Sequence, residues 1–111
     1  MGRFNATRRA GSAATLRLAA PLSTEWSPTG STTMTITATR TVSIPPGGDG
    51  WGLMVIKQPP PNAPTVTGQF GATTAVASAL TPVTSYAVYA AWYSGAVRLS
   101  DWSTPQLFST I

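Results

Sequence analysis

The chain has 111 residues, enough for one domain with a two-layer core. It contains neither cysteine nor histidine, which excludes disulfides, thiolate metal sites and histidine-based catalysis. Charged residues make up only 9%, and 18 Thr and 11 Ser supply most of the polarity, which is typical of an all-β protein. The net charge of +4 resides in the first seventeen residues, because the later charges balance.

Residues 1–14 show no hydrophobic period and are rich in Gly, Ala, Ser and Arg. We expect them to form a basic arm in front of a domain that spans residues 15–111. No secretory signal is expected, since Arg17 interrupts the apolar stretch 13–20, and no segment is long enough to span a membrane.

The arm is the strongest candidate for a partner contact, although a solvated tail is the alternative interpretation. A nucleic-acid partner is disfavoured, because the arm has one aromatic residue and the rest of the chain is neutral. We therefore expect the arm to bind a protein surface. The residues expected to make this contact are Arg3, Phe4, Arg8, Arg9 and Arg17.

The first strands follow from alternation. Residues 15–18 predict a short strand, and 27–30 (SPTG) indicate a turn. Residues 33–44 place apolar side chains, beginning with Met34, at even positions and hydroxyls at odd positions. This period of two predicts a half-buried antiparallel strand that bends near Arg40.

Two strands are apolar on both faces and are therefore expected to be central. They are residues 51–57 (WGLMVIK), after the turn 45–50, and residues 86–93 (YAVYAAWY). Trp51 and Trp92 are expected in the core. The proline-rich stretch 58–64 predicts a loop or an edge crossing between sheets; a polyproline II ligand is the alternative.

The remaining strands are expected at residues 73–80, 97–99 and 106–111. About seven strands at spacings of roughly 8–12 residues predict an antiparallel β-sandwich.

A family resemblance covers the last thirty residues. Residues 80–86 (LTPVTSY) resemble the Leu-x-Pro-x-Thr-x-Tyr corner of fibronectin type III domains, and residues 100–110 resemble the last strand of that family and its lead-in. The resemblance implies an immunoglobulin-like sandwich with a structural corner at Leu80, Pro82 and Tyr86, in which Tyr86 is buried and bonds upstream backbone. The family's tryptophan in the second strand is missing, and Trp51 is expected to fill its place.

Catalysis has few candidate groups. Glu25, Asp49 and Asp101 are the only acids, and their spacing implies neither a shared site nor a metal cage. We therefore expect no enzyme activity, metal or cofactor. Trp26 and Trp102 are possible surface rings for ligand stacking, with Arg98 stacked on one of them, although packing against the strands is the alternative.

The combination of a basic arm with a cysteine-free, weakly charged sandwich suits a component of a large assembly. The leading hypothesis is a bacteriophage virion protein, either a capsid decoration (cement) protein or a tail accessory protein. It would be made in the host cytoplasm and would bind capsid or tail subunits, or copies of itself, through the arm. The alternative is a carbohydrate-binding or adhesion module that uses exposed tryptophans.

Overall fold

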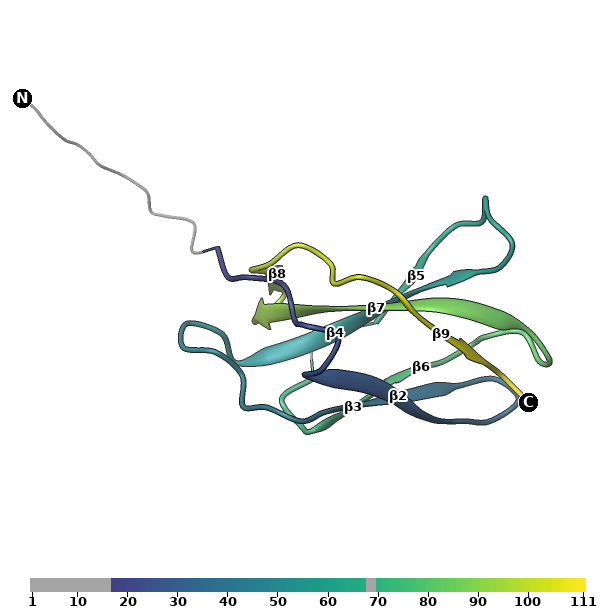
Figure 1. The fold of residues 1–111 in the computed structure, drawn as a ribbon, viewed down its shortest axis with the longest axis horizontal. Helices are drawn as coiled ribbons and strands as arrows, with labels where there is room; N and C mark the ends of the chain where they lie inside the picture. The colour runs from purple at the N-terminus through teal and green to yellow at the C-terminus, as the bar shows by residue number, and fades with distance from the viewer. Residues whose placement is uncertain (1–16, 68–69) are drawn as a thin grey trace, which may run out of the picture.

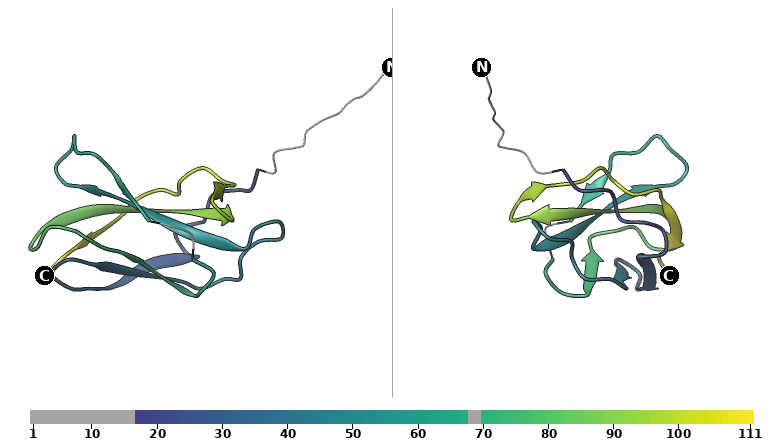
Figure 2. Two further views of the ribbon diagram at one scale, coloured as in Figure 1. Left: turned by 180° about the vertical axis from the view of Figure 1, so that it is seen from behind. Right: turned by 60° about the vertical axis from the view of Figure 1, so that its left-hand side comes forward.

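The computed structural model describes residues 17–67 and 70–111, which form two β-sheets packed face to face (Figure 1, Figure 2). One sheet has three strands in the order β2 (Trp26–Ser31), β3 (Ile36–Arg40) and β6 (Thr74–Ala77). The other has five strands: β5 (Thr65–Val66), β4 (Gly50–Lys57), β7 (Ser85–Ser94), β8 (Val97–Arg98) and β9 (Gln106–Ser109). All pairs between these strands are antiparallel, so the predicted all-β sandwich is confirmed.

The expected central strands are central. β4 lies between β5 and β7, and β7 pairs with β4 on one side and with β8 and β9 on the other. Within the described residues there is no helix, and so none that is long and apolar enough to cross a bilayer.

The core holds three fully buried tryptophans, Trp26, Trp51 and Trp92. The three-stranded sheet contributes small side chains to the same cluster, which leaves room for the indoles between the sheets. These small residues are Ala38, Ala75 and Ala77. Trp51 lies in this core, as expected, and β3 contains no tryptophan. The indole nitrogen of Trp51 donates a hydrogen bond to the Ala72 carbonyl at 2.9 Å.

The entrance to β7 has the geometry that the corner motif predicts. Tyr86 is only 4% exposed, and its hydroxyl accepts a hydrogen bond from the backbone N–H of Thr81 at 2.9 Å. Leu80 is buried in the same core. The ring of Tyr86 thus anchors the chain where it passes from β6 to β7, and its polar atom remains satisfied.

The prediction of a turn at residues 27–30 is wrong, because these residues belong to strand β2. The segment forms an edge strand paired with β3, and the register shifts between Pro28 and Gly30. An edge strand tolerates both residues. Proline lacks a backbone N–H, which is not needed on the side of the strand that has no neighbour, and a bulge accommodates glycine.

The strand expected at residues 33–44 is shorter than predicted. Only Ile36–Arg40 forms β3, and Met34 lies in the preceding turn with 52% of its surface exposed. Val42 and Ile44 still pack against the core from outside the strand. Arg40 stabilises the bend, since its guanidinium donates to the carbonyls of Val42 and Gly71.

Three further boundaries differ from expectation. The strand expected at 15–18 is represented, within the described residues, by an isolated parallel bridge between Leu18 and Ser100. The proline-rich stretch 58–64 joins β4 to β5 within one sheet, so it is not a crossing between sheets. The strand expected at 73–80 ends at Ala77, before Ala79 adopts a left-handed conformation with φ of 61°.

Candidate functional site

The outward side of the five-stranded sheet is apolar. In β4 and β7 the residues between the core positions point away from the three-stranded sheet, and they pair across the strands as Met54 with Tyr89 and Ile56 with Ala87. Met54, Ile56 and Tyr89 are half-buried, whereas the neighbouring outward residues Ala87, Ala91 and Tyr93 are buried, and the described strands form no third layer over them. A two-layer fold therefore leaves an apolar sheet surface facing outward.

This surface extends across the full width of the sheet. Val66 of β5 pairs with Met54 and is 52% exposed, whereas Leu107 of β9 pairs with Ala87 and is 73% exposed. We call this surface the outer face. Its members are Met54, Ile56, Val66, Tyr89 and Leu107, together with Tyr93, Arg98 and Trp102 at the β8 end.

Aromatic stacking organises the β8 end of the outer face. The rings of Tyr93 and Trp102 meet edge to face, with centroids 6.3 Å apart and an interplanar angle of 60°. The Arg98 guanidinium carbon lies 5.3 Å from the centre of the Trp102 ring, so the expected stacking of this arginine is present. Burial raises the pKa of Tyr93, and the nearby charge of Arg98 opposes that rise. Tyr93 is therefore a neutral phenol at physiological pH.

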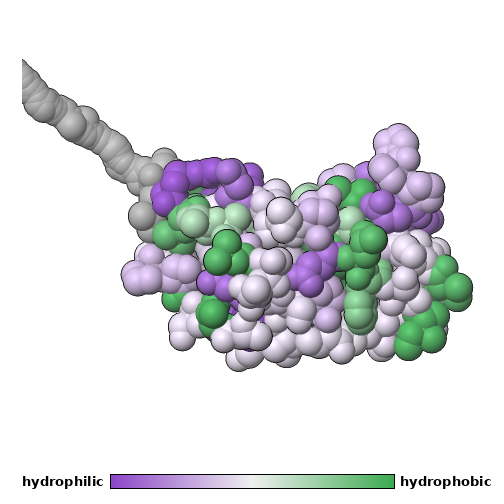
Figure 3. Space-filling model, in the orientation of Figure 1, coloured by the Kyte–Doolittle hydropathy of each residue, from purple (hydrophilic) through white to green (hydrophobic). Residues whose placement is uncertain are grey.

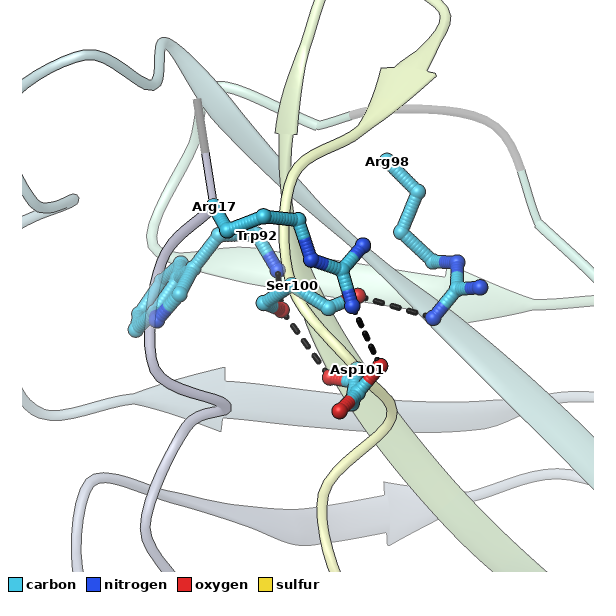
Figure 4. A network of polar contacts seen from close by, with 5 residues as sticks. All are labelled: Arg17, Trp92, Arg98, Ser100 and Asp101. Carbon is cyan, nitrogen blue, oxygen red and sulfur yellow. Dashed lines mark hydrogen bonds and ion pairs between the residues drawn. The ribbon is translucent and has the colours of Figure 1, made fainter. Parts of the chain in front are cut away.

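Two buried serines position the segment that carries Trp102. The hydroxyl of Ser100 accepts the Trp92 N–H at 3.0 Å, and the hydroxyl of Ser103 accepts the Ala90 N–H at 2.9 Å. Arg98 also donates to the Ser100 carbonyl at 2.8 Å (Figure 4). Side-chain oxygens thus hold this segment against β7 where the regular ladder between strands is interrupted.

Of the five residues predicted to bind a partner through the arm, Arg3, Phe4, Arg8 and Arg9 lie outside the described residues, and their role stays a prediction. Arg17 is described, and it forms an ion pair with Asp101 at 2.5 Å (Figure 4). Its predicted role in partner binding also stays a prediction. Both side chains are more than half exposed, so this pair contributes little to stability.

A shallow groove lies beside this ion pair. Residues 20–24 form one wall and residues 101–104 the other, around a hollow of about 650 Å³. Trp102 lines it, and the side chain of Leu22 is 61% exposed. The Glu25 carboxylate accepts the Leu22 N–H at 2.9 Å and so fixes the first wall.

The proposed pair of stacking tryptophans is not formed. Trp26 is 1% exposed and belongs to the core, because β2 turns its ring toward the opposite sheet. Trp102 is partly exposed, but Arg98 and Tyr93 already contact its ring.

The acids are separated in the described part of the chain, where no three metal-ligating side chains gather. Asp101 pairs with Arg17, Glu25 accepts from Leu22, and Asp49 accepts the Gly95 N–H at 3.0 Å. Each acid thus has a local structural contact.

Sequence reasoning missed most of the outer face, although its signal was present. Residues 51–57 and 86–93 were correctly interpreted as apolar on both sides. In a domain of only two layers, however, the second apolar side of a central strand has no layer of its own to cover it. The two-sided pattern therefore predicts an exposed apolar surface as well as a central strand.

No family model and no curated protein matches the chain in sequence. Solved structures match it in shape. A myokine structure superposes with a TM-score of 0.62 at 17% identity, over 83% of this chain and 96% of that one. The FN1–FN3 domains of chicken CNTN1 superpose with a TM-score of 0.67 at 12% identity, over 94% of this chain and 34% of that one. A computationally redesigned β-sandwich protein gives 0.52 at 22% identity, over 77% and 84%.

These similarities establish the fold. The chain is a fibronectin type III-like β-sandwich, as the resemblance of residues 80–110 implied. At such low identity the partners of those proteins say nothing about this one.

Proposed function

We propose that this chain is a non-enzymatic interaction domain whose outer face binds a protein partner. The observation that carries the proposal is the apolar surface of the five-stranded sheet, on which Val66 and Leu107 are more than half exposed and Met54, Ile56 and Tyr89 are partly exposed. Contiguous apolar surface rimmed by polar residues marks interaction sites in folded domains.

The composition of the outer face supports a protein partner. Tyrosine, tryptophan, methionine and arginine are enriched in the centres of protein interfaces, and lysine and glutamate are depleted. Tyr89 and Met54 lie side by side in the centre, and Arg98 provides the cation at one end. The complementary surface would be apolar and would place a carboxylate opposite Arg98.

For the setting we propose a bacteriophage virion, in which the domain acts as a capsid decoration or tail accessory protein. The support is compositional: the chain has no cysteine, only 9% charged residues and a basic segment 1–14. That segment would add contacts with a neighbouring subunit.

The alternative, a carbohydrate-binding module, retains one observation in its favour, because Trp102 lines the groove. Its second ring, Trp26, is buried.

The test is co-sedimentation of the full-length chain with purified phage particles, or capture of partners from cells that produce it. Val66→Glu and Leu107→Glu place a charge on exposed positions of the outer face. Val76→Glu is the matched control, since Val76 is 38% exposed on the outward side of the other sheet. We expect the first two variants to lose the partner and the control to keep it.

Equal retention of all three variants would eliminate the outer face as the binding surface. Loss of binding by a chain that lacks residues 1–14, with the outer-face variants unaffected, would assign the contact to the arm instead. Absence of the protein from purified particles, together with capture of another specific partner, would reject the virion setting and keep the outer face.

A further inference from the structure

One edge of the three-stranded sheet has no neighbouring strand in the described part of the chain. There β6 pairs with β3 alone, in a regular antiparallel register. The Arg40 N–H donates to the Thr73 carbonyl, so the odd-numbered residues of β6 exchange hydrogen bonds with β3 and the even-numbered ones do not. The N–H and C=O groups of Thr74 and Val76 therefore point away from β3. We call these four groups the β6 edge.

The other edges of the described sheets are less able to accept a strand. β2 contains Pro28 and a register shift, and its Trp26 carbonyl already accepts the side-chain amide of Gln106 at 2.8 Å. β5 has two residues and follows the proline-rich stretch 58–64. The edge beside β7 is divided among β8, β9 and two serine hydroxyls. In contrast, β6 has no proline, charge or bulge, and an edge without these features favours pairing with another strand.

The shortness of the β6 edge selects a partner strand that is already ordered. The edge offers two donors and two acceptors before Ala79 adopts its left-handed conformation. Four hydrogen bonds are too few to offset the conformational entropy that a free peptide loses when it becomes a strand. A strand that a folded domain already holds in an extended conformation loses far less. The β6 edge of a second copy is such a strand.

We infer that the β6 edges of two copies pair antiparallel about a two-fold axis and join the two three-stranded sheets into one sheet of six strands. In the register centred on Ala75, Thr74 of each copy faces Val76 of the other, and each of these pairs exchanges two hydrogen bonds. Every group of both β6 edges is then bonded. The two Ala75 residues meet on the axis as a non-hydrogen-bonded pair, where opposed side chains lie closest and methyl groups fit.

This contact has two further properties. It is isologous, because the same strand contributes both halves, so association stops at two copies. It also leaves the outer face free, since the outer face belongs to the other sheet. The inference is therefore independent of the proposed partner.

Charge within the joined sheet does not oppose this contact. Residues 72–80 carry no charge, and Arg40 is the only charged residue in β2, β3 and β6. In the two-fold register the two Arg40 residues lie at opposite ends of the contact, about 20 Å apart from strand spacings, which exceeds the screening length in physiological salt. Lys57 belongs to β4 in the other sheet. The side of the domain that carries β2 and β3 is mostly pale in Figure 3, because serine and threonine have intermediate hydropathy (Figure 1, Figure 3).

The register predicts which charges permit pairing. A double variant with Thr74→Lys and Val76→Lys places like charges directly opposite each other in both pairs, and it should remain monomeric. The matched variant with Thr74→Glu and Val76→Lys places opposite charges in the same pairs and should dimerise at least as tightly as the wild type. Both variants change only exposed outward side chains, so the fold should be retained. Leu107→Glu, on the outer face, should associate like the wild type.

Sedimentation equilibrium of the full-length chain measures the association. Because the contact is small, the wild-type Kd should be on the order of 0.1 mM, and the dimer should dominate at about 1 mM. A wild type that stays monomeric at that concentration would overturn the inference. So would dimerisation of the double-lysine variant, or a monomeric Glu/Lys variant that circular dichroism shows to be folded.

Hydrogen exchange provides a second measurement that locates the contact. The amides of Thr74 and Val76 should exchange about fivefold more slowly at about 1 mM than at about 10 μM protein, because pairing protects them. The amide of Val66 is the matched control: the Thr67 N–H donates to the Leu53 carbonyl, so the Val66 N–H also points off an edge. Its exchange should not depend on concentration. Protection of Thr74 and Val76 only by a captured partner, with the chain alone monomeric, would assign the β6 edge to another protein and reject pairing between copies.

Discussion

The two sheets share one core but present opposite surfaces to their surroundings. On the three-stranded sheet the outward residues are hydroxyl-bearing, apart from Val76 and Gly30, and the hydroxyls of Thr29 and Thr39 are bonded to each other at 2.9 Å. On the five-stranded sheet the outward residues are Met54, Tyr89 and their apolar neighbours. Both sheets are antiparallel, and in both sheets successive side chains alternate between the core and the outward side.

The difference between the outward side chains of the two sheets shows that strands form without an apolar outward side. Threonine has a branched side chain that favours strands, and it still offers a hydroxyl to water. β3 alternates Thr37 and Thr39 with buried core residues and forms a regular strand. The rings and aliphatic groups on the outward side of the five-stranded sheet are therefore not required for strand formation, which is consistent with the binding surface proposed above.

The largest effect should come from the core under both surfaces. Tyr86→Ala removes a buried ring and its hydrogen bond to Thr81, and it should lower the free energy of unfolding by about 3–5 kcal/mol. Tyr86→Phe removes only the hydrogen bond and should cost about 1 kcal/mol. Urea denaturation measures both. If the alanine variant were as stable as the wild type, Tyr86 would not be a buried part of the core.

The comparison of the two surfaces is tested most directly by paired alanine variants. Tyr89→Ala should weaken partner binding by roughly 2 kcal/mol, about thirtyfold, because large central aromatics dominate interface energies. Thr37→Ala, on the outward side of the other sheet, should change binding by less than about 0.5 kcal/mol. Titration calorimetry with the captured partner measures both. Equal losses would remove the distinction between the surfaces.

Arg98 and Arg17 extend the comparison to charge. Arg98→Ala removes a cation–π contact and a hydrogen bond to Ser100, and it should destabilise the fold by about 1 kcal/mol. Arg17→Ala breaks an exposed ion pair and should cost a few tenths of a kcal/mol at most. Thermal unfolding of both variants at low and high salt measures the two losses of stability separately. A larger loss for Arg17→Ala would show that the Asp101 contact is a structural clamp.

The smallest effect concerns Tyr93 at alkaline pH. Its pKa in the folded state lies above the ordinary 10.0 because burial disfavours the phenolate. As pH rises past 10.0 the unfolded chain therefore loses this proton first, and stability falls until the pH passes the raised pKa. Tyr93→Phe should flatten that part of the stability curve, measured by urea unfolding at several alkaline pH values. If Tyr93→Phe left the slope of stability against pH unchanged, other titrating groups would cause the loss of stability.

The sequence predicted the layers better than it predicted the surfaces. Alternation in residues 51–57 and 86–93 identified β4 and β7, because tryptophan and branched side chains in a two-sided pattern leave few alternatives. β2 was missed, because Pro28 and Gly30 resemble a turn when the edge position that tolerates them is unknown.

The candidate site depended on information that a linear pattern lacks. Trp26 and Trp102 both stand beside turn-forming residues, yet β2 turns the first into the core and a pair of serines holds the second near the surface. The left-handed backbone of Val83 and its hydrogen bond to the Ile111 carbonyl likewise do not follow from local sequence.

The interrupted edge beside β7 has a consequence for aggregation. Its length is shared among β9, the hydroxyls of Ser100 and Ser103, and the two residues of β8. A further strand that arrived from another molecule would find only short pieces of ladder there, separated by a segment whose side chains occupy the hydrogen-bonding positions. Long flat edges are the templates on which cross-β fibrils grow. This edge of the apolar sheet is therefore a poor template for fibril growth.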